Sequence, residues 1–317
     1  LDGNKMYGRT SNKKRLYYKC IPFDTKIPIF LVPYNISIGF SKTFTNKYVL
    51  FTYDNWNEKH PYGLLNTTIG DVDSFDAFCE YQLHCNNQTH SIKQFSKTIQ
   101  QIITDNTEDK CIHKILQNKN YNIEDRTDEY VFSIDPQDSV DFDDAFSIQP
   151  YKNNDSLFRI SIYIANVYVW LEEFDLWGHL SDRASTIYLP KKKQPMIPPI
   201  MSDRLCSLQK KTKRFAICMD IVVNQQGKVV SEIPFQYKNV MISVCNNFVY
   251  DEKRMQENIH YKRMYDITHK MDNTITDSHD LVAFWMIFMN SHTGLYMKQQ
   301  KIGIFRTVSY IVPPSET

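Results

Sequence analysis

The chain has 317 residues, enough for about two domains, and 42% of them are hydrophobic and 23% charged. These fractions are ordinary for a globular protein and exclude a largely disordered chain. The formal net charge of +1 gives no overall attraction to nucleic acid, so any such binding must come from local basic clusters.

Two further classes are unsupported by the sequence. The longest apolar run, from Leu281 to Met289, is far shorter than the roughly 20 residues of a membrane helix. The N-terminal residues lack the apolar core of a signal peptide. We therefore expect no membrane partner and no secretion.

The seven cysteines are dispersed along the chain without a CxxC pair. An odd and scattered set does not indicate a disulfide framework, and free thiols are typical of reducing compartments. We therefore expect a cytoplasmic location, with the nucleus as the alternative. His84, Cys85, Cys111 and His113 are too isolated to indicate zinc sites, and we interpret them as surface or core residues.

The N-terminal part of the chain contains short strand-like runs. Residues 1–19 are polar and basic, and we expect a poorly ordered arm there. In residues 20–70, runs rich in β-branched and aromatic residues predict strands at 27–32, 36–40 and 47–53. Several short strands in so short a segment predict a small β-barrel or sandwich.

The next segment has helical spacing. Apolar residues three and four apart predict helices at 74–83 and 91–103. Polar residues follow and predict a linker at 106–128. The first domain would therefore take residues 20–105, including a trailing helix, and the second would take residues 129–317.

The second domain mixes strands and helices. Residues 129–250 contain strand-like runs, with a hairpin turn predicted at 224–227. Residues 251–300 have helical spacing, with one apolar stripe from Leu281 to Leu295. We interpret this stripe, including His292, as core. The order of elements predicts an α+β fold.

The densest group of carboxylates lies in the segment SIDPQDSVDFDDAFSI, between two strand-like runs. Its members are Asp135, Asp138, Asp141, Asp143 and Asp144. Carboxylates this close repel one another unless a cation or water screens them, and their oxygen atoms suit Mg²⁺, Mn²⁺ or Ca²⁺. On a strand, Asp141 and Asp143 would point to one face and Asp144 to the other.

Composition alone leaves two interpretations of this cluster open. One is an acidic surface loop with Asx-turns. The other is a metal-binding set of carboxylates between buried strands. An EF-hand loop does not fit, because the segment has no Gly and position 12 counted from Asp135 is Phe146. A calcium-binding structural loop of another kind is a third possibility.

Several segments, in one collinear order, resemble a known family. The aspartate segment resembles the signature of the ribonuclease II catalytic domain, the RNB domain, and the resemblance continues through ISIYIANVYVWL, residues 183–221 and residues 224–243. DTKIPIFLV and residues 55–78 resemble the cold-shock-like OB domain that precedes it. The spacing of Trp56, Pro61, Gly63 and Gly70 resembles the ribonuclease R-like catalytic exoribonuclease of the eukaryotic exosome more than bacterial ribonuclease II.

This resemblance implies a cold-shock-like OB barrel followed by a partial RNB domain. It implies a Mg²⁺-dependent, 3′-to-5′ hydrolytic exoribonuclease that acts on single-stranded RNA by a two-metal mechanism and releases nucleoside 5′-monophosphates, with Mn²⁺ as the alternative metal. It also implies metal ligands at Asp135, Asp141, Asp143 and Asp144, with Asp143 and Asp141 as the catalytic pair. Asp138 falls at a variable position of the family.

The resemblance also implies RNA contacts. Tyr188 matches a family tyrosine that stacks on the 3′-terminal base, although without the motif it would be interpreted as a core strand residue. Two basic clusters would line a phosphate path or, alternatively, form a solvated face. The predicted RNA contacts are Tyr188, Lys191, Lys192, Lys193, Lys211 and Arg214.

Two departures from the family pattern keep a second function open. Tyr163 and Asn166 stand where the family has His and Asp, and nothing after Arg306 resembles the family's later arginine-containing segment. The alternative is therefore an inactive RNA-binding or scaffold relative. Expected partners are single-stranded RNA and either exosome-like subunits or a second chain that supplies the rest of the RNB domain.

Overall fold

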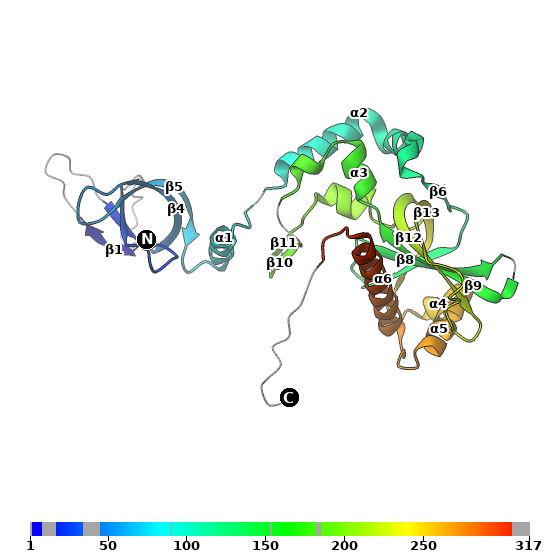
Figure 1. The fold of residues 1–317 in the computed structure, drawn as a ribbon. Coiled ribbons are helices and arrows are strands. Elements are labelled where there is room, and N and C mark those ends of the chain that lie inside the picture. The colour runs from blue at the N-terminus through cyan, green and yellow to red at the C-terminus, as the bar shows by residue number, and fades with distance from the viewer. Residues whose placement is uncertain are drawn as a thin grey trace. The chain divides into compact units, whose positions relative to one another are not determined.

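The computed structural model describes residues 2–7, 17–33, 45–89, 91–152, 154–181 and 185–305. The chain forms two compact units, one of residues 1–91 with 181–196 and the other of residues 92–180 with 197–317. Figure 1 shows their elements in chain order. None of the described helices combines the length and the apolar character needed to cross a membrane.

The first unit contains a five-stranded sheet in the order β1-β2-β3-β5-β4. Its strands are β1 (Asp2–Tyr7), β2 (Tyr17–Cys20), β3 (Phe30–Pro33), β4 (Lys47–Asn55) and β5 (Tyr62–Asp71). Strands β3 and β5 are parallel and the other neighbours antiparallel. Its core is small and centres on Cys20, Phe30 and Val32. A Cβ at Gly63 would lie 2.7 Å from the Phe51 side chain, so only glycine fits there.

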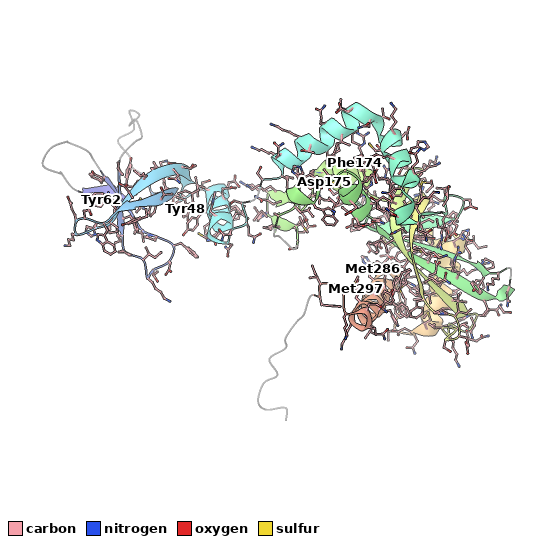
Figure 2. The ribbon with its side chains drawn as sticks, turned by 45° about the horizontal axis from the view of Figure 1, so that its top comes forward. Tyr48, Tyr62, Phe174, Asp175, Met286 and Met297 are labelled. Atoms are coloured by element: carbon pink, nitrogen blue, oxygen red, sulfur yellow. The ribbon has the colours of Figure 1, made fainter. Side chains whose placement is uncertain are left out.

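Helix α1 (Phe75–Cys85) packs directly on this sheet. It begins after Ser74, whose hydroxyl accepts a hydrogen bond from the Ala77 N–H, as expected of an N-cap. Tyr48 of β4, labelled in Figure 2, stacks on Tyr81 of the helix with ring centroids 4.2 Å apart. The same unit includes the hairpin of β10 (Ile187–Leu189) and β11 (Lys192–Gln194).

The second unit is built on strands that close into a ring. The sheet order is β12-β9-β8-β7-β13-β6, and β13 pairs with β12 as well. The first half of β13 pairs with β12 and its second half with β7, so this one strand closes the ring. The strands are β6 (Glu124–Asp125), β7 (Val131–Asp135), β8 (Asp144–Tyr151), β9 (Asn154–Ala165), β12 (Lys213–Asn224) and β13 (Gln236–Val249).

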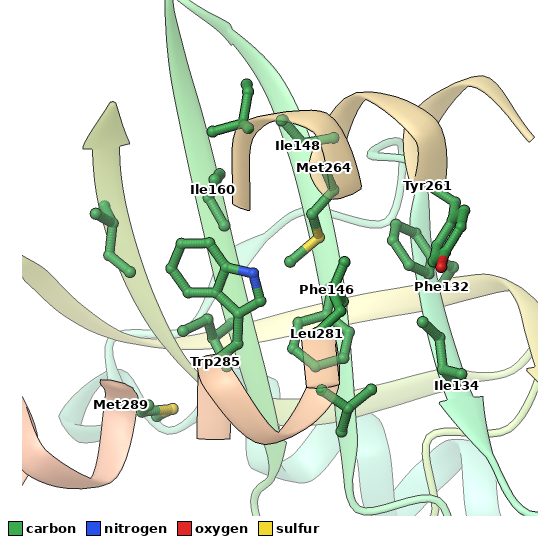
Figure 3. Close-up of a cluster of buried hydrophobic side chains, with 14 of the residues drawn as sticks. Phe132, Ile134, Phe146, Ile148, Ile160, Tyr261, Met264, Leu281, Trp285 and Met289 are labelled. Carbon is green, nitrogen blue, oxygen red and sulfur yellow. The ribbon is translucent and has the colours of Figure 1, made fainter. Parts of the chain in front are cut away.

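Alternate residues of the ring strands face two different cores, as the twofold period of a strand requires. The outer face packs under α4 (Lys253–Gln256), α5 (Ile259–Met271) and α6 (Ser278–Gln300). Figure 3 shows Met264 and Trp285 of these helices over Phe146 and Ile160. The inner face has smaller side chains, namely Val131, Ala145, Tyr163, Ala216, Cys218, Val240, Ile242 and Val244.

A third core belongs to the helices on the other side of the unit. It joins α2 (Lys93–Gln117), α3 (Tyr168–Glu173) and the π-helical turn η3 (Ile200–Leu205). Its buried side chains include Phe95 and Ile115 of α2 and Trp170 of α3. The short helices η1 (Lys119–Tyr121) and η2 (Trp177–His179) complete the unit.

Two predicted boundaries differ from the structure. The helix predicted at 91–103 continues to Gln117 across a kink at Thr107, and it belongs to the second unit instead of trailing the first. Most of the predicted linker at 106–128 is therefore structured, because the second half of α2 buries Cys111 and Ile115. The predicted arm at 1–19 contains β1, which pairs with β2.

Other predicted elements are confirmed. Strand β3 overlaps the range predicted at 27–32, β4 covers 47–53 and α1 overlaps the helix predicted at 74–83. Gly227 N–H donates to Asn224 O in the predicted turn. The strand predicted at 36–40 lies outside the described residues. The α+β fold is confirmed. The apolar stripe is core only in its first half, because Leu281 and Trp285 are buried and Leu295 is 56% exposed.

A buried ion pair crosses the inside of the ring. Arg126 is 1% exposed, and its two terminal nitrogens donate to the two carboxylate oxygens of Asp220 over 2.8 and 2.7 Å. Ser161 on β9 donates to the same carboxylate over 2.6 Å. Burial opposes the ionisation of Asp220, but the hydrogen bonds from Arg126 and Ser161 outweigh it and lower its pKa to about 2.

We predict that Arg126→Met lowers the free energy of unfolding by about 3–5 kcal/mol, because Asp220 would remain buried without its partner. The matched control is Arg254→Met, which removes an exposed ion pair with Glu252 and should cost at most about 1 kcal/mol. Urea titration followed by circular dichroism measures both. Equal effects of the two substitutions would contradict the structural role of Arg126.

Candidate active site

The predicted aspartates lie where two neighbouring strands of the ring begin and end. Strand β7 ends at Asp135 and β8 begins at Asp144. Because the two strands are antiparallel neighbours, these two residues lie at the same end of the ring. Asp141 and Asp143 come from the loop that joins the strands.

Asp135 is nearly buried, with 8% of its surface exposed. The Ser133 hydroxyl donates to its carboxylate over 2.6 Å, and Asn247 in turn donates to that hydroxyl over 2.8 Å. Burial, followed by the charges of Asp143 and Asp141, raises the pKa of Asp135 to about 6 despite the hydrogen bond from Ser133. This carboxylate is therefore held in place in an environment that disfavours its charge.

Asp144 is in a similar position on the neighbouring strand. Burial, and then the charges of Asp135 and Asp143, raise its pKa to about 7. Its Oδ2 atom is buried and has no hydrogen-bond partner among the residues that the structure describes. A buried carboxylate oxygen without a partner is costly, and a cation or donor at this point would remove the cost.

The loop with Asp141 and Asp143 is tied down through its backbone. Phe142 N–H donates to the Ser207 hydroxyl over 3.0 Å, and Ala165 N–H donates to Asp143 O over 2.8 Å. Phe142 packs against the inner core of the ring. Asp143 is exposed and Asp141 partly so, and both lie before the start of β8, so the strand alternation expected of them does not apply. Asp138 is also exposed.

Asp135 and Asp144 fit a metal site that waters and substrate would complete. No group of three or more His, Cys, Asp or Glu side chains in the described part of the chain is arranged to hold a metal ion unaided. Mg²⁺ is commonly bound by only one or two protein carboxylates, with waters and substrate phosphates completing its shell. The unpartnered Oδ2 of Asp144 and the raised pKa values of Asp135 and Asp144 fit such a site.

Tyr250 also belongs to this end of the ring, and it was not predicted from the sequence. It follows β13, whose parallel pairing places Val249 opposite Asp135, and its N–H donates to Asp135 O over 3.2 Å. Burial, and then the charges of Asp144 and Asp135, raise the pKa of its phenol. His279 stacks on its ring, with centroids 3.7 Å apart. Only the long-range pairing of β13 with β7 brings Tyr250 here, so no local pattern predicts it.

The predicted RNA contacts Tyr188 and Lys191 to Lys193 lie in the first unit. Tyr188, on β10, is 77% exposed, so it is not a core residue. Lys191 pairs with Asp76 over 3.2 Å and Lys192 with Glu80 over 3.0 Å, both on α1. Both pairs are exposed and therefore contribute little stability.

Arg214 differs from its prediction. It is 5% exposed, and it donates to Glu108 on α2 over 3.0 Å and to Ser207 O over 3.0 Å. Its guanidinium is thus a structural link between β12 and α2, so the prediction of a direct RNA contact is wrong. Lys211 is exposed and lines a cavity of about 350 Å³ beside α2.

The two departures from the family segment are both buried in the second unit. The Tyr163 hydroxyl lies 3.0 Å from Glu129 and 2.9 Å from the Ser147 hydroxyl. The Asn166 amide donates to Asn239 over 3.0 Å. Both are 1% exposed or less, so their side chains change the hydrogen bonding of the interior and not of the surface.

Comparison with known proteins finds a similar domain for part of each unit. Residues 123–262 match the RNB domain, and residues 17–87 match the Dis3-like cold-shock domain 2. DIS3-like exonuclease 2 of Schizosaccharomyces pombe is 25% identical over 253 residues, which cover 76% of this chain and 26% of that protein. Ribonuclease R of Mycoplasmopsis pulmonis is 35% identical over 124 residues, which cover 39% of this chain and 16% of that protein.

Solved structures share the fold. Mycoplasma genitalium RNase R in complex with double-stranded RNA matches with a TM-score of 0.62 and 18% identity, over 88% of this chain and 55% of that one. Yeast Ssd1, a pseudonuclease, matches with a TM-score of 0.51 and 14% identity, over 81% of this chain and 32% of that one. At these identities the likeness concerns the fold alone.

The chain spans about a quarter or less of the length of these two curated relatives. Within that span, the cold-shock match coincides with the first unit and the RNB match with the ring of the second. Residues 123–262 are therefore similar to the RNB domain and residues 17–87 to a Dis3-like cold-shock domain, and the chain resembles ribonuclease R and the DIS3-like exonucleases.

Proposed function

We propose that the chain is part of a divalent-metal-dependent exoribonuclease that hydrolyses single-stranded RNA from its 3′ end and releases nucleoside 5′-monophosphates. The proposed metal is Mg²⁺, with Mn²⁺ as the alternative. The observation that carries the proposal is the set of four aspartates at one end of the ring, two of them with strongly raised pKa values. Because the chain spans only part of its relatives, this activity is proposed for the whole protein.

Each aspartate has a proposed role. Asp135 and Asp144 would hold the cation directly. Their carboxylates are fixed at the ends of two strands, and burial there disfavours the charged form and raises their pKa values. Asp141 would support them, and the exposed Asp143 would hold a second ion or orient the attacking water. Divalent cations at such a site supply a hydroxide nucleophile and neutralise charge on the phosphate that is cut, which is the two-metal mechanism.

RNA contacts are proposed for the first unit and for Lys211. Tyr188 offers an exposed ring on which any base can stack. Lys191 and Lys192 have only exposed ion pairs, so phosphates can replace Asp76 and Glu80 at little cost. Structures of Mycoplasma genitalium RNase R with single-stranded and double-stranded RNA support RNA as the ligand. Exosome-like subunits or a second chain as partners, and a cytoplasmic location, remain proposals.

The alternative function is an inactive RNA-binding relative. The fold occurs both in RNase R and in yeast Ssd1, a pseudonuclease, so the fold does not distinguish the two functions. The aspartates favour the enzyme. A protein that only binds RNA has no need of two carboxylates with raised pKa values, or of a buried Asp144 Oδ2 without a hydrogen-bond partner among the described residues.

We predict that Asp143→Asn reduces hydrolysis by about 100-fold or more, since it removes a group that orients the reacting water, while RNA binding is kept. The matched control is Asp138→Asn, which removes an exposed carboxylate from the same loop and should leave the rate unchanged. A 5′-labelled single-stranded RNA with Mg²⁺ is the substrate. Turnover that is unchanged by Asp143→Asn in the whole protein refutes the assignment, and a retarded but uncut RNA with the unmodified whole protein favours the alternative.

A second prediction concerns pH in the absence of metal. The folded chain holds protons on Asp135 up to about pH 6 and on Asp144 up to about pH 7, whereas the unfolded chain loses them near pH 4. The free energy of unfolding should therefore fall as the pH rises from 4 to 7. Asp144→Asn should reduce this fall and raise the Tm at pH 8 by about 2–4 °C.

Differential scanning fluorimetry with EDTA measures the effect, and Asp138→Asn is the control. Addition of Mg²⁺ at pH 8 should raise the Tm of the unmodified chain more than that of Asp144→Asn, because the ion stabilises the charged carboxylate. If the Tm of both the unmodified chain and Asp144→Asn rises with pH from 4 to 7, the pKa values of Asp135 and Asp144 are not raised in the folded chain.

A third prediction tests base stacking. Tyr188→Ala should weaken single-stranded RNA binding by about 1–3 kcal/mol, the usual value of one base stack. Tyr188→Trp keeps an aromatic ring at this exposed position and should bind RNA as tightly as the unmodified chain. Fluorescence anisotropy in EDTA measures both. Equal affinities of the Ala and Trp variants would remove Tyr188 from the RNA site.

A further inference from the structure

A basic cavity lies in the second unit, at the end of the ring opposite the aspartates. It has a volume of about 340 Å³ and lies between α5, the β12–β13 hairpin and β9. Its lining residues are Phe158, Gln225, Ile259, Lys262, Arg263, Asp266, Ile267 and Lys270. Phe158 precedes Ile164, the partner of Asp144, by six residues along β9, which is about 20 Å.

The charge of the cavity is strongly positive for its size. Lys262, Arg263 and Lys270 provide three positive charges against the one negative charge of Asp266. The whole chain has a net charge of only +1. Among the described residues, no acidic side chain forms an ion pair with Lys262 or Arg263. The cavity therefore concentrates positive charge that the protein itself does not neutralise.

Neighbouring elements hold these cations in place. The Arg263 guanidinium lies over the Phe158 ring, 5.5 Å from its centroid. The Lys270 ammonium donates to Gln225 O over 3.0 Å, which leaves its other protons available. Lys262, Asp266 and Lys270 are four residues apart on α5 and thus share one face of the helix. Arg263 and Lys270 are therefore oriented before any ligand binds.

The hairpin that forms one wall is also held rigidly. Gly227 has a φ of +77°, and a Cβ there would lie 2.9 Å from Met271 N and 3.0 Å from Ile267 O. The turn therefore packs against the end of α5 in a way that only glycine allows. Asn224 closes the turn by accepting hydrogen bonds from the N–H groups of Gln226 and Lys228.

Apolar side chains lie among the cations of the cavity. Ile259, on α5 with the lysines, is 64% exposed, and Ile267 and Phe158 also line the cavity. An anion that presents a charged group beside an apolar group would match this lining. A nucleotide of a polynucleotide chain has this character, with a phosphate beside a sugar and a base.

We propose that this cavity binds a backbone phosphate of a single-stranded RNA, at a site separate from the aspartates. Lys262, Lys270 and Arg263 contact the phosphate oxygens, and Ile259 contacts the adjoining sugar or base. Asp266 limits the affinity, because it reduces the positive charge. The inference extends the proposed function by a second RNA contact on the unit that contains the aspartates, and it can be tested without hydrolysis.

The test compares two matched double variants of the full chain in EDTA, so that no RNA is cut. Lys262→Gln/Lys270→Gln removes two exposed cations of the cavity, and Lys97→Gln/Lys298→Gln removes two exposed lysines of α2 and α6 outside it. Glutamine and lysine have similar helix propensity, so both variants should fold. Anisotropy of a labelled single-stranded RNA is measured over a range of salt concentrations.

The cavity variant should bind RNA about tenfold more weakly, and the slope of log affinity against log salt should decrease by about 0.7 for each phosphate that the variant no longer neutralises. The control variant should stay within about twofold of the unmodified chain, and Asp266→Asn should bind more tightly. Equal affinities of the two double variants overturn the proposal.

Free phosphate compounds are the competing source of the same chemistry. Titration with inorganic phosphate and with a nucleoside monophosphate tests them. If these bind the unmodified chain but not the cavity variant, and RNA affinity is equal in both, the cavity is a site for a small phosphate compound and the proposal fails. Hydrolysis with Mg²⁺ is measured separately on the whole protein, so a protein that binds RNA through the cavity but does not cut it refutes only the proposed function.

Discussion

The pairing of Arg126 with Asp220 inside the ring is the interaction on which the second unit depends. Arg126 follows β6, Asp220 lies on β12 and Ser161 on β9, so three segments far apart in the sequence converge on one carboxylate. Neither charge is tolerable alone in a buried space, and each therefore requires the other in place. The pair spans the inside of the ring that β13 closes.

The aspartate site is a consequence of that closure. The ring brings the end of β7, the start of β8 and the end of β13 to one edge, where Asp135, Asp144 and Tyr250 meet. Burial at this edge removes water from Asp135 and raises its pKa. The folded ring thus keeps Asp135 and Asp144 in a site that disfavours their charged forms. A bound cation would stabilise these charged forms with the strands in their present places.

Local sequence patterns predicted the elements and the aspartates, because these depend on neighbours in the chain. Strand β4 and helix α1 are of this kind. Contacts between distant residues were not predictable in the same way. Arg214 is buried because Glu108, on α2, accepts its hydrogen bond, and Tyr250 reaches the site through the pairing of β13 with β7. The second half of α2 was not predicted, because its buried face is defined by packing in the same core as Trp170, which is distant in the sequence.

The filled interior of the ring has a consequence for access. Tyr163, Cys218 and Arg126 occupy it at 0 to 1% exposure, and their polar atoms are engaged with Glu129, Ser147 and Asp220. The interior of the ring is therefore filled with side chains, and no polymer can pass along its axis. A polymer that reaches the aspartates must approach them across the edge of the ring. The loops at that edge, and not the strands, would therefore determine which molecules can bind.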